Sequence, residues 1–282
     1  MIIDCHTHVF SPEVIARRDE YAAVDACFAL LYGSGKAKLR TAEDLVRVMD
    51  RNGIDKSVIL NIGWTSHDRC VSSNDYILEA ADRYPGRLIP FIAVQLQAGQ
   101  SAAAEISRCA AAGARGVGEL RLDAENLTRP DPRTANPAIK AVIAHNLVLL
   151  LHVDEPVGHH YPGNGSLTPE VLYPFIKDNP ELKLILAHWG GGLPFYALMP
   201  EVREALRNVW FDSAANPFLY RAEVYERVVD LVGDTKILFG SDWPLLAQKR
   251  CLAQLDDLNL SQWSTNRILG RNAAELFALT DD

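Results

Sequence analysis

Two histidines near the N-terminus, His6 and His8, have the residue type and the spacing of a metal-binding pair. They lie in the apolar stretch Ile2–Val9, which is typical of a buried β-strand. Side chains two residues apart on a strand point to the same face, so both imidazoles would face one site. Imidazole is a common ligand of divalent metals, although His-x-His also occurs at strand ends without one. The pair therefore predicts a metal site at the end of this strand.

Four further ionisable residues lie at or near the C-terminal ends of other apolar stretches. They are Glu119, His152, His188 and Asp242. An ionisable side chain within an apolar strand needs a partner to offset its loss of hydration. Four histidines and two carboxylates at one edge of a sheet are most simply reconciled by one or two divalent cations. For Glu119 alone, an ion pair with Arg121 on the same strand face is the alternative.

Short apolar runs that alternate with amphipathic stretches must position these residues. Several runs are apolar throughout, as strands buried on both faces are. The predicted strands are Ile2–Val9, Ser57–Ile62, Leu88–Val94, Gly116–Leu122, Leu147–Val153, Leu182–His188, Val209–Asp212 and Lys236–Gly240. Helices are predicted at residues 74–84, 101–112, 134–145, 168–178, 195–207 and 220–232, and the capping pairs Thr41/Asp44 and Asn272/Glu275 predict two more.

Eight alternations of strand and helix, without a visible linker, predict a single (β/α)8 TIM barrel over residues 1–282. Such barrels place their catalytic groups at the C-terminal ends of the strands, where the candidate ligands fall. A doubly wound sheet is the alternative, but the first strand–helix turn lacks the Gly-x-Gly-x-x-Gly spacing of a dinucleotide site. Residues 11–40 do not fit the repeat and are predicted to be an insertion over the barrel mouth.

The composition favours some partners and argues against others. The net charge is −8 and no run of Lys or Arg occurs, which argues against a nucleic-acid partner. The five cysteines form no Cys-x-x-Cys motif, which favours reduced thiols. The chain shows no cationic leader, and its apolar runs are far shorter than the roughly 20 residues of a membrane helix. We therefore expect a cytoplasmic protein that acts on a small molecule, without a membrane partner.

The motifs around the candidate ligands resemble those of the amidohydrolase superfamily. They are Asp4-Cys5-His6-Thr7-His8, His152, Ala187-His188-Trp189-Gly190-Gly191-Gly192 and Phe239-Gly240-Ser241-Asp242-Trp243-Pro244. Over nearly its whole length the chain is most similar to the amidohydrolase-2 branch, which includes the relatives of aminocarboxymuconate-semialdehyde decarboxylase. This resemblance implies a metal-dependent barrel enzyme. It also implies that His6, His8, His152 and Asp242 bind the metal, usually zinc with manganese as the alternative. His188 would be a second-metal ligand or a catalytic acid/base.

The segment Gly118-Glu119-Leu120 departs from that branch. It resembles the bridging glutamate of TatD-type deoxyribonucleases in the same superfamily, whereas the decarboxylase branch does not generally need a carboxylate here. Glu119 as a further ligand therefore leaves open whether the site holds one metal or two. The acidic composition still argues against a DNA substrate.

The resemblance leads to two hypotheses for the reaction. In a hydrolase, a metal-activated water attacks the carbonyl of an amide, ester or lactone, Asp242 accepts its proton, and His188 stabilises the developing charge or protonates the leaving group. In a carboxy-lyase, the same centre supports non-oxidative decarboxylation of an unsaturated or aromatic acid. A metal-free lactonase and a non-catalytic metal-binding barrel are further hypotheses. More than four candidate ligands at an open mouth favour catalysis over a closed structural site.

Four residues near the strand ends are candidates for contact with the substrate. Arg121 shares the inward direction of Glu119 and would bind a carboxylate or form an internal ion pair. Trp64 follows the second strand and would either wall the pocket or pack in the core. His159 and His160 lie in the loop after the fifth strand, where they would contact substrate or simply be exposed. The apolar residues of the insertion would cover the pocket or join two chains in a homodimer.

Overall fold

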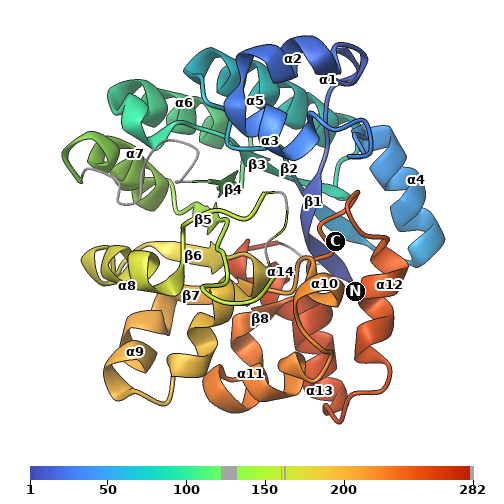
Figure 1. Ribbon diagram of the computed structural model, residues 1–282, viewed down its shortest axis with the longest axis vertical. Helices are drawn as coiled ribbons and strands as arrows, with labels where there is room; N and C mark the ends of the chain where they lie inside the picture. Colours follow the sequence, from blue (N-terminus) through green and yellow to red (C-terminus); the bar gives the residue numbers. More distant parts are fainter. Residues whose placement is uncertain (122–131, 160, 162, 280–282) are drawn as a thin grey trace.

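Eight parallel strands form one sheet in which each strand pairs with the next along the chain (Figure 1). The computed structural model describes residues 1–121, 132–159, 161 and 163–279. The strands are β1 (Ile3–His8), β2 (Lys56–Leu60), β3 (Leu88–Ile92), β4 (Gly116–Leu120), β5 (Val148–Leu151), β6 (Lys183–Leu186), β7 (Val209–Asp212) and β8 (Ile237–Leu238). The backbone N–H of Cys5 donates to Phe239 O at 2.8 Å, and that of His8 donates to Trp243 O at 2.7 Å. These bonds join β1 to the chain at and after β8, and the predicted (β/α)8 barrel is confirmed.

Helices lie around the sheet, most of them on its outer side (Figure 1). They are α1 (Pro12–Ala16), α2 (Arg18–Val24), α3 (Ala26–Tyr32), α4 (Ala42–Asn52), α5 (His67–Arg83), α6 (Gln100–Ala111), α7 (Pro132–Ala144), α8 (Pro169–Asp178), α9 (Pro200–Ala205), α10 (Asn216–Leu219), α11 (Val224–Val232), α12 (Gln248–Leu252), α13 (Gln262–Asn266) and α14 (Asn272–Leu276). Among the described residues, no helix combines the length and the apolar character that crossing a membrane requires. All five cysteines are buried and free, as expected of reduced thiols.

Alternating side chains along each strand build two cores. Val148 and Leu150 of β5 belong to the cluster inside the barrel, whereas Leu149 and Leu151 pack in the cluster under the outer helices. Helix α14 closes the end of the barrel that holds the N-terminal ends of the strands. Phe277, just after this helix, contacts Phe91 with ring centroids 5.4 Å apart. The C-terminal ends of the strands are thereby left as the accessible end of the barrel.

The predicted helix boundaries were partly right. The capping box at Thr41 is confirmed, with Asp44 N–H donating to Thr41 Oγ1 at 3.3 Å and Thr41 N–H to Asp44 Oδ2 at 3.2 Å. The capping role of Asn272 was wrong. Its side-chain amide instead donates to Asp234 O at 2.7 Å and Ile237 O at 2.8 Å, which ties α14 to β8. The helix predicted at 195–207 was also too long.

The segment that precedes α9 explains that last error. Residues 188–196 form a 3-10 segment in which the backbone from Trp189 to Gly192 takes left-handed angles, so α9 does not begin until Pro200. A run of glycines supports left-handed angles at little cost, whereas a regular helix does not include them. The helix predicted at 220–232 likewise begins later, at Val224.

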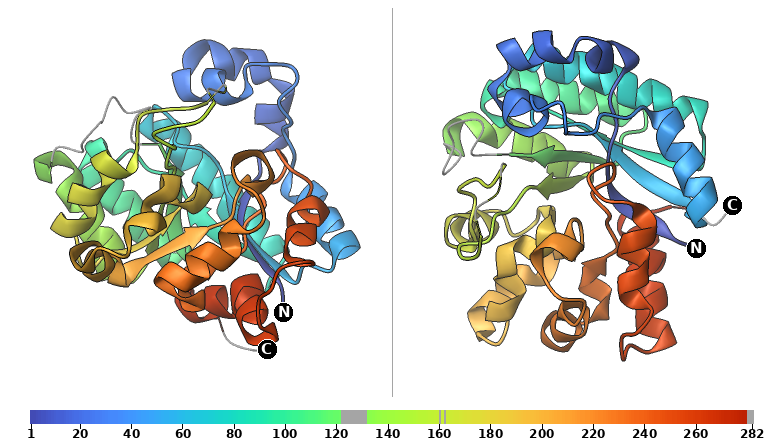
Figure 2. Two further views of the ribbon diagram at one scale, coloured as in Figure 1. Left: turned by 60° about the horizontal axis from the view of Figure 1, so that its bottom comes forward. Right: turned by 45° about the vertical axis from the view of Figure 1, so that its right-hand side comes forward.

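The segment predicted as an insertion, residues 11–40, contains α1, α2 and α3, which lie together beside α5 (Figures 1 and 2). Their inner side forms an aromatic cluster that includes Phe28 and Trp64, whose rings stack with centroids 5.2 Å apart. The buried carboxylate of Asp25 accepts hydrogen bonds from Phe28 N–H at 3.0 Å and from Thr65 N–H at 2.9 Å. Asp25 therefore caps α3 and ties it to the loop after β2.

A buried carboxylate holds the end of β3 between α5 and α6. Glu105 accepts hydrogen bonds from Asn74 at 2.8 Å and from Arg108 at 2.7 and 2.8 Å. Asn74 in turn bonds both backbone groups of Ala93, just after β3. Burial raises the pKa of Glu105, but the bonds from Arg108 and Asn74 lower it to about 2. The carboxylate therefore favours the folded state wherever it is ionised in the unfolded chain.

We predict that Glu105→Gln lowers the free energy of unfolding by about 1–3 kcal/mol at neutral pH, since a buried charge-assisted network is lost. The wild-type advantage should be complete above about pH 4.5 and disappear as the pH falls towards 2. Urea unfolding across this pH range measures it. Glu204→Gln, an exposed carboxylate paired with Arg207, is the control that should not change stability. A Glu105→Gln variant as stable as wild type at pH 7 would contradict the interpretation.

Candidate metal centre

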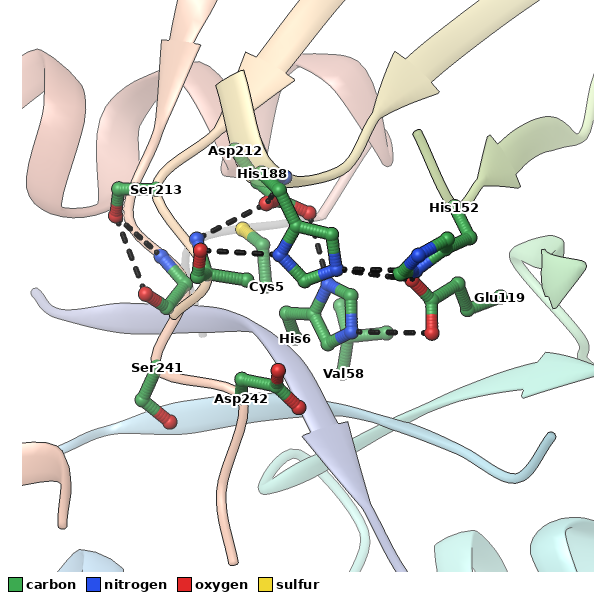
Figure 3. Close-up of polar contacts among 12 residues, drawn as sticks. Cys5, His6, Val58, Glu119, His152, His188, Asp212, Ser213, Ser241 and Asp242 are labelled. Carbon is green, nitrogen blue, oxygen red and sulfur yellow. Dashed lines mark hydrogen bonds and ion pairs between the residues drawn. The ribbon is translucent and has the colours of Figure 1, made fainter. Parts of the chain in front are cut away.

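The six predicted ligands converge at the C-terminal end of the barrel, and Figure 3 labels all of them except His8. They are His6, His8, Glu119, His152, His188 and Asp242, of which all but Asp242 are fully or nearly fully buried. His6 Nε2 lies 3.2 Å from His8 Nε2, and His188 Nε2 lies 3.2 Å from His152 Nδ1. Asp242 Oδ1 lies 3.3 Å from His8 Nε2. Residues from five different strand ends thus meet at one point.

Glu119 lies between two pairs of histidines. Its Oε2 is 3.6 Å from His6 Nε2 and 3.7 Å from His8 Nε2, whereas its Oε1 is 2.8 Å from His152 Nδ1 and 3.3 Å from His188 Nε2. Two groups of three donor atoms therefore share this carboxylate, each compact enough to hold an ion. The carboxylate of Glu119 therefore faces the four histidines, which argues against the alternative in which its main partner is Arg121.

Each histidine is oriented by a bond from its outer ring nitrogen. His6 Nδ1 lies 2.9 Å from Asp212 Oδ2, His8 Nδ1 lies 2.8 Å from Asn61 O, and His188 Nδ1 lies 3.1 Å from Ala214 O. His152 is turned the other way, with Nε2 3.2 Å from Asp154 Oδ1. When the outer nitrogen donates its hydrogen, the inner nitrogen keeps a lone pair directed at the centre. This is the arrangement of outer partners that metal-binding histidines have.

Asp212 and Asp154 are site residues that the sequence analysis missed. Asp212, the last residue of β7, accepts from His6 through Oδ2 and from the backbone N–H groups of His188 and Ala214 through Oδ1, both at 3.0 Å. It therefore fixes both a ring and a turn of the centre. Its position at a strand end is the same signal that marked His152, so this residue was detectable.

Unusual backbone angles direct two of the candidate ligands. His188 has φ +57° and Asp242 has φ +63°, in the left-handed region that side-chain-bearing residues seldom adopt. Gly118 has φ +133°, and a Cβ atom there would collide with the carbonyl oxygen of Leu150. Glycine at this position lets β4 approach β5 and brings Glu119 to His152.

The electrostatics of the centre favour a charged carboxylate among cationic groups. Burial raises the pKa of Glu119, but the charges of His152 and His6 lower it well below its usual range. Burial lowers the pKa of His188, but its hydrogen bond to Glu119 raises that pKa to about 9. Without a metal, protons on the imidazoles balance the carboxylates, and a divalent cation can replace them. The donor set and its outer partners therefore fit a metal ion.

A cavity of about 440 Å³ opens onto this centre. Besides five of the six candidate ligands, its walls include Tyr32, Lys38, Arg121, His159 and Phe218. Arg121 is buried and donates from Nη2 to Gly163 O at 2.7 Å. The arginine and Lys38 bring positive charge to the cavity, and Phe218 gives it an apolar wall.

Of the other three predicted substrate contacts, His159 lines this cavity, Trp64 lies elsewhere and His160 lies outside the described residues. Trp64 packs in the aromatic cluster under α3 and is not among the described residues that line this cavity. It borders a separate cavity between the insertion and α5. His159 lines the main cavity, with its ring centroid 5.7 Å from that of Tyr161. His160 lies outside the described residues.

Comparison with known proteins gives relatives with one fold and two reactions. The family profile described as amidohydrolase matches residues 3–279. The chain is 25% identical over 259 residues to the L-fucono-1,5-lactonase of Burkholderia ambifaria, a match that covers 86% of this chain and 80% of the relative. The 5-carboxyvanillate decarboxylase of Sphingomonas paucimobilis has a similar structure, with a TM-score of 0.79, 17% identity and 99% coverage of both chains.

A dihydroxybenzoic acid decarboxylase from a Polaromonas species, solved with manganese and 2-nitroresorcinol, is also similar in structure. Its TM-score is 0.76 at 20% identity, with 100% of this chain and 98% of that chain covered. At these identities the two decarboxylases show the shared fold alone.

We predict that Asp212→Asn weakens metal binding about 10- to 100-fold. The amide can place an N–H opposite His6 Nδ1, which favours the tautomer whose inner nitrogen carries the hydrogen and cannot bind a metal. Competition with a chelating dye measures the affinity. Asp25→Asn, a buried aspartate away from the centre, is the matched control and should bind metal as wild type does. Equal affinities in all three proteins would contradict the role of Asp212.

Proposed function

The chain belongs to the amidohydrolase family, and we propose that it is a metal-dependent hydrolase that opens a small anionic ester or lactone. The observation that carries the proposal is the position of Asp242. This acidic side chain lies beside the candidate metal ligands and lines the cavity. The lactonase relative supports hydrolysis. When bound, a divalent metal would polarise the carbonyl and lower the pKa of the attacking water.

Asp242 is suited to take the proton from that water. Asp4, Asp154 and Asp212 each accept two or more hydrogen bonds from outer groups, whereas the contact given for the Asp242 carboxylate among the described residues is with His8. Burial raises the pKa of Asp242, but the hydrogen bond and charge of His8, together with the charges of His6 and His188, lower it to about 2. The carboxylate is therefore ionised at neutral pH and has acceptor capacity left for a water.

His188 can serve the other side of the reaction. Its Nδ1 is held by Ala214 O, and its Nε2 faces the cavity beside Glu119. With one metal bound by His6, His8, His152 and Asp242, this nitrogen could donate a proton to the leaving oxygen. With two metals bridged by Glu119, His188 would be a ligand instead. We propose zinc as the metal, with manganese as the alternative because one solved relative holds it.

Arg121 and Lys38 are proposed to bind the acidic group of the substrate. Arg121 is buried at one side of the cavity and Lys38 is exposed at its rim, so a carboxylate between them would meet two cations. Phe218 and Leu219 of α10 would contact the apolar part of the substrate. His159 would approach from the loop after β5. We propose that the substrate is a small molecule rather than a nucleic acid, because the chain carries a net charge of −8.

The second candidate is non-oxidative decarboxylation of an aromatic acid. The structural relatives named as decarboxylases favour it, and so does the positive charge of a cavity with an apolar wall. In that reaction the carboxylate that is lost would lie near the metal centre and not at Arg121. An acid from the centre would protonate the ring carbon. The two reactions have different products, an acid from the lactone and carbon dioxide from the aromatic acid, so one assay separates them.

We predict that the zinc-loaded protein releases acid from a sugar δ-lactone such as L-fucono-1,5-lactone, and that Asp242→Asn lowers kcat about 10²- to 10⁴-fold. A pH-stat measures acid release, and elemental analysis confirms that the variant still holds metal. Asp256→Asn, an exposed carboxylate, is the control. Unchanged kcat with metal retained would overturn the role of Asp242. Carbon dioxide release from a dihydroxybenzoate, without lactone opening, would replace the hydrolase by the decarboxylase.

A further inference from the structure

Tyr32 is a polar residue of the insertion that reaches the reaction cavity. It is the last residue of α3, and it lines the same cavity as Glu119, His188 and Asp242. It belongs to neither the ligand set nor the outer partners of the histidines. Because α3 ends at this cavity wall, the insertion reaches whatever binds over the centre.

The phenol ring of Tyr32 is held in place by neighbours. Its centroid lies 4.8 Å from that of Phe10 in an edge-on arrangement and 5.6 Å from that of Phe28. Helix α3 is itself fixed at its other end, where the buried Asp25 bonds Thr65 through N–H at 2.9 Å and through Oγ1 at 2.7 Å. Because both the ring and the helix that carries it are held by neighbours, the side chain loses little further conformational entropy when it binds a partner.

The hydroxyl of Tyr32 has no hydrogen-bond partner among the residues that the structure describes. Burial, and then the negative charges of Asp242 and Glu119, raise the pKa of this phenol well above its usual value. The phenol is therefore protonated, and an O–H donor, at neutral pH. The hydroxyl oxygen is accessible from the cavity, so a ligand that enters there can supply its acceptor.

We propose that Tyr32 donates a hydrogen bond to the carbonyl oxygen of the ester or lactone, and that this bond strengthens as negative charge develops on that oxygen. The inference rests on the proposed hydrolysis and deepens it. Tyr32 keeps its proton throughout, so it stabilises charge and does not transfer a proton. Donors fixed in advance at the point where charge develops act mainly on the transition state. The insertion would then take part in the chemistry and not only cover the pocket.

The test compares Tyr32→Phe with Tyr21→Phe in the zinc-loaded protein. Both changes remove one hydroxyl and keep the ring in the same aromatic cluster, but Tyr21 borders the separate cavity beside α5. We expect Tyr32→Phe to lower kcat for the lactone about 10²-fold, with KM changed less than about threefold. Tyr21→Phe should behave as wild type. A raised KM with unchanged kcat, or no change in either, would overturn the proposal.

A binding measurement keeps the test independent of turnover. Methylphosphonate is a tetrahedral anion that resembles the charged tetrahedral species formed when water attacks the carbonyl. Calorimetry can follow its binding to each zinc-loaded protein. We expect Tyr32→Phe to weaken this binding about tenfold and Tyr21→Phe to leave it unchanged. Equal affinity of wild type and Tyr32→Phe would overturn the role of Tyr32. If wild type binds the anion in a Tyr32-dependent way but opens no lactone, the proposed hydrolysis fails while the donor role stands.

Discussion

The structure depends on bringing four imidazoles and two carboxylates together out of water. Burying such groups is unfavourable unless they are paired and hydrogen-bonded, and here each histidine has one nitrogen bonded to a carboxylate or a carbonyl. The second nitrogen of each ring faces the others and Glu119. This leaves a concentration of lone pairs that protons or a divalent cation must balance. The position of every outer partner follows from that requirement.

The barrel meets the requirement because its strands end at one mouth, and local backbone distortions then adjust each side chain. His152 continues the inward direction of Val148 and Leu150, so regular strand geometry suffices for it. His188 and Asp242 need left-handed backbone angles, and Glu119 needs a glycine before it. Strain of this kind is tolerated where surrounding bonds hold it, as Asp212 does for the backbone of His188. The insertion then adds Tyr32 and Lys38 to the walls of the cavity.

Much of this arrangement could be predicted from sequence because its signals are local. Apolar runs gave the strands, and ionisable residues at their ends gave the six candidate ligands. Asp212 also ends a predicted strand, but its role as the outer partner of His6, 206 residues away, leaves no local trace. Asn272 looked like a helix cap because its distant acceptors at β8 cannot be seen in sequence. The sequence analysis did not single out Tyr32 within the insertion, since the path of that segment back to the mouth depends on tertiary packing.

The central claim is that these residues form a metal centre, and the metal content of the purified chain tests it most directly. Protein prepared without chelator and reconstituted with zinc or manganese should hold about one ion, or two if Glu119 bridges, and His6→Asn should lose most of it. One ion per chain would leave His188 free as an acid, whereas two would make it a ligand. Wild-type protein that holds no metal after reconstitution, or a His6→Asn variant that holds as much as wild type, would contradict the account.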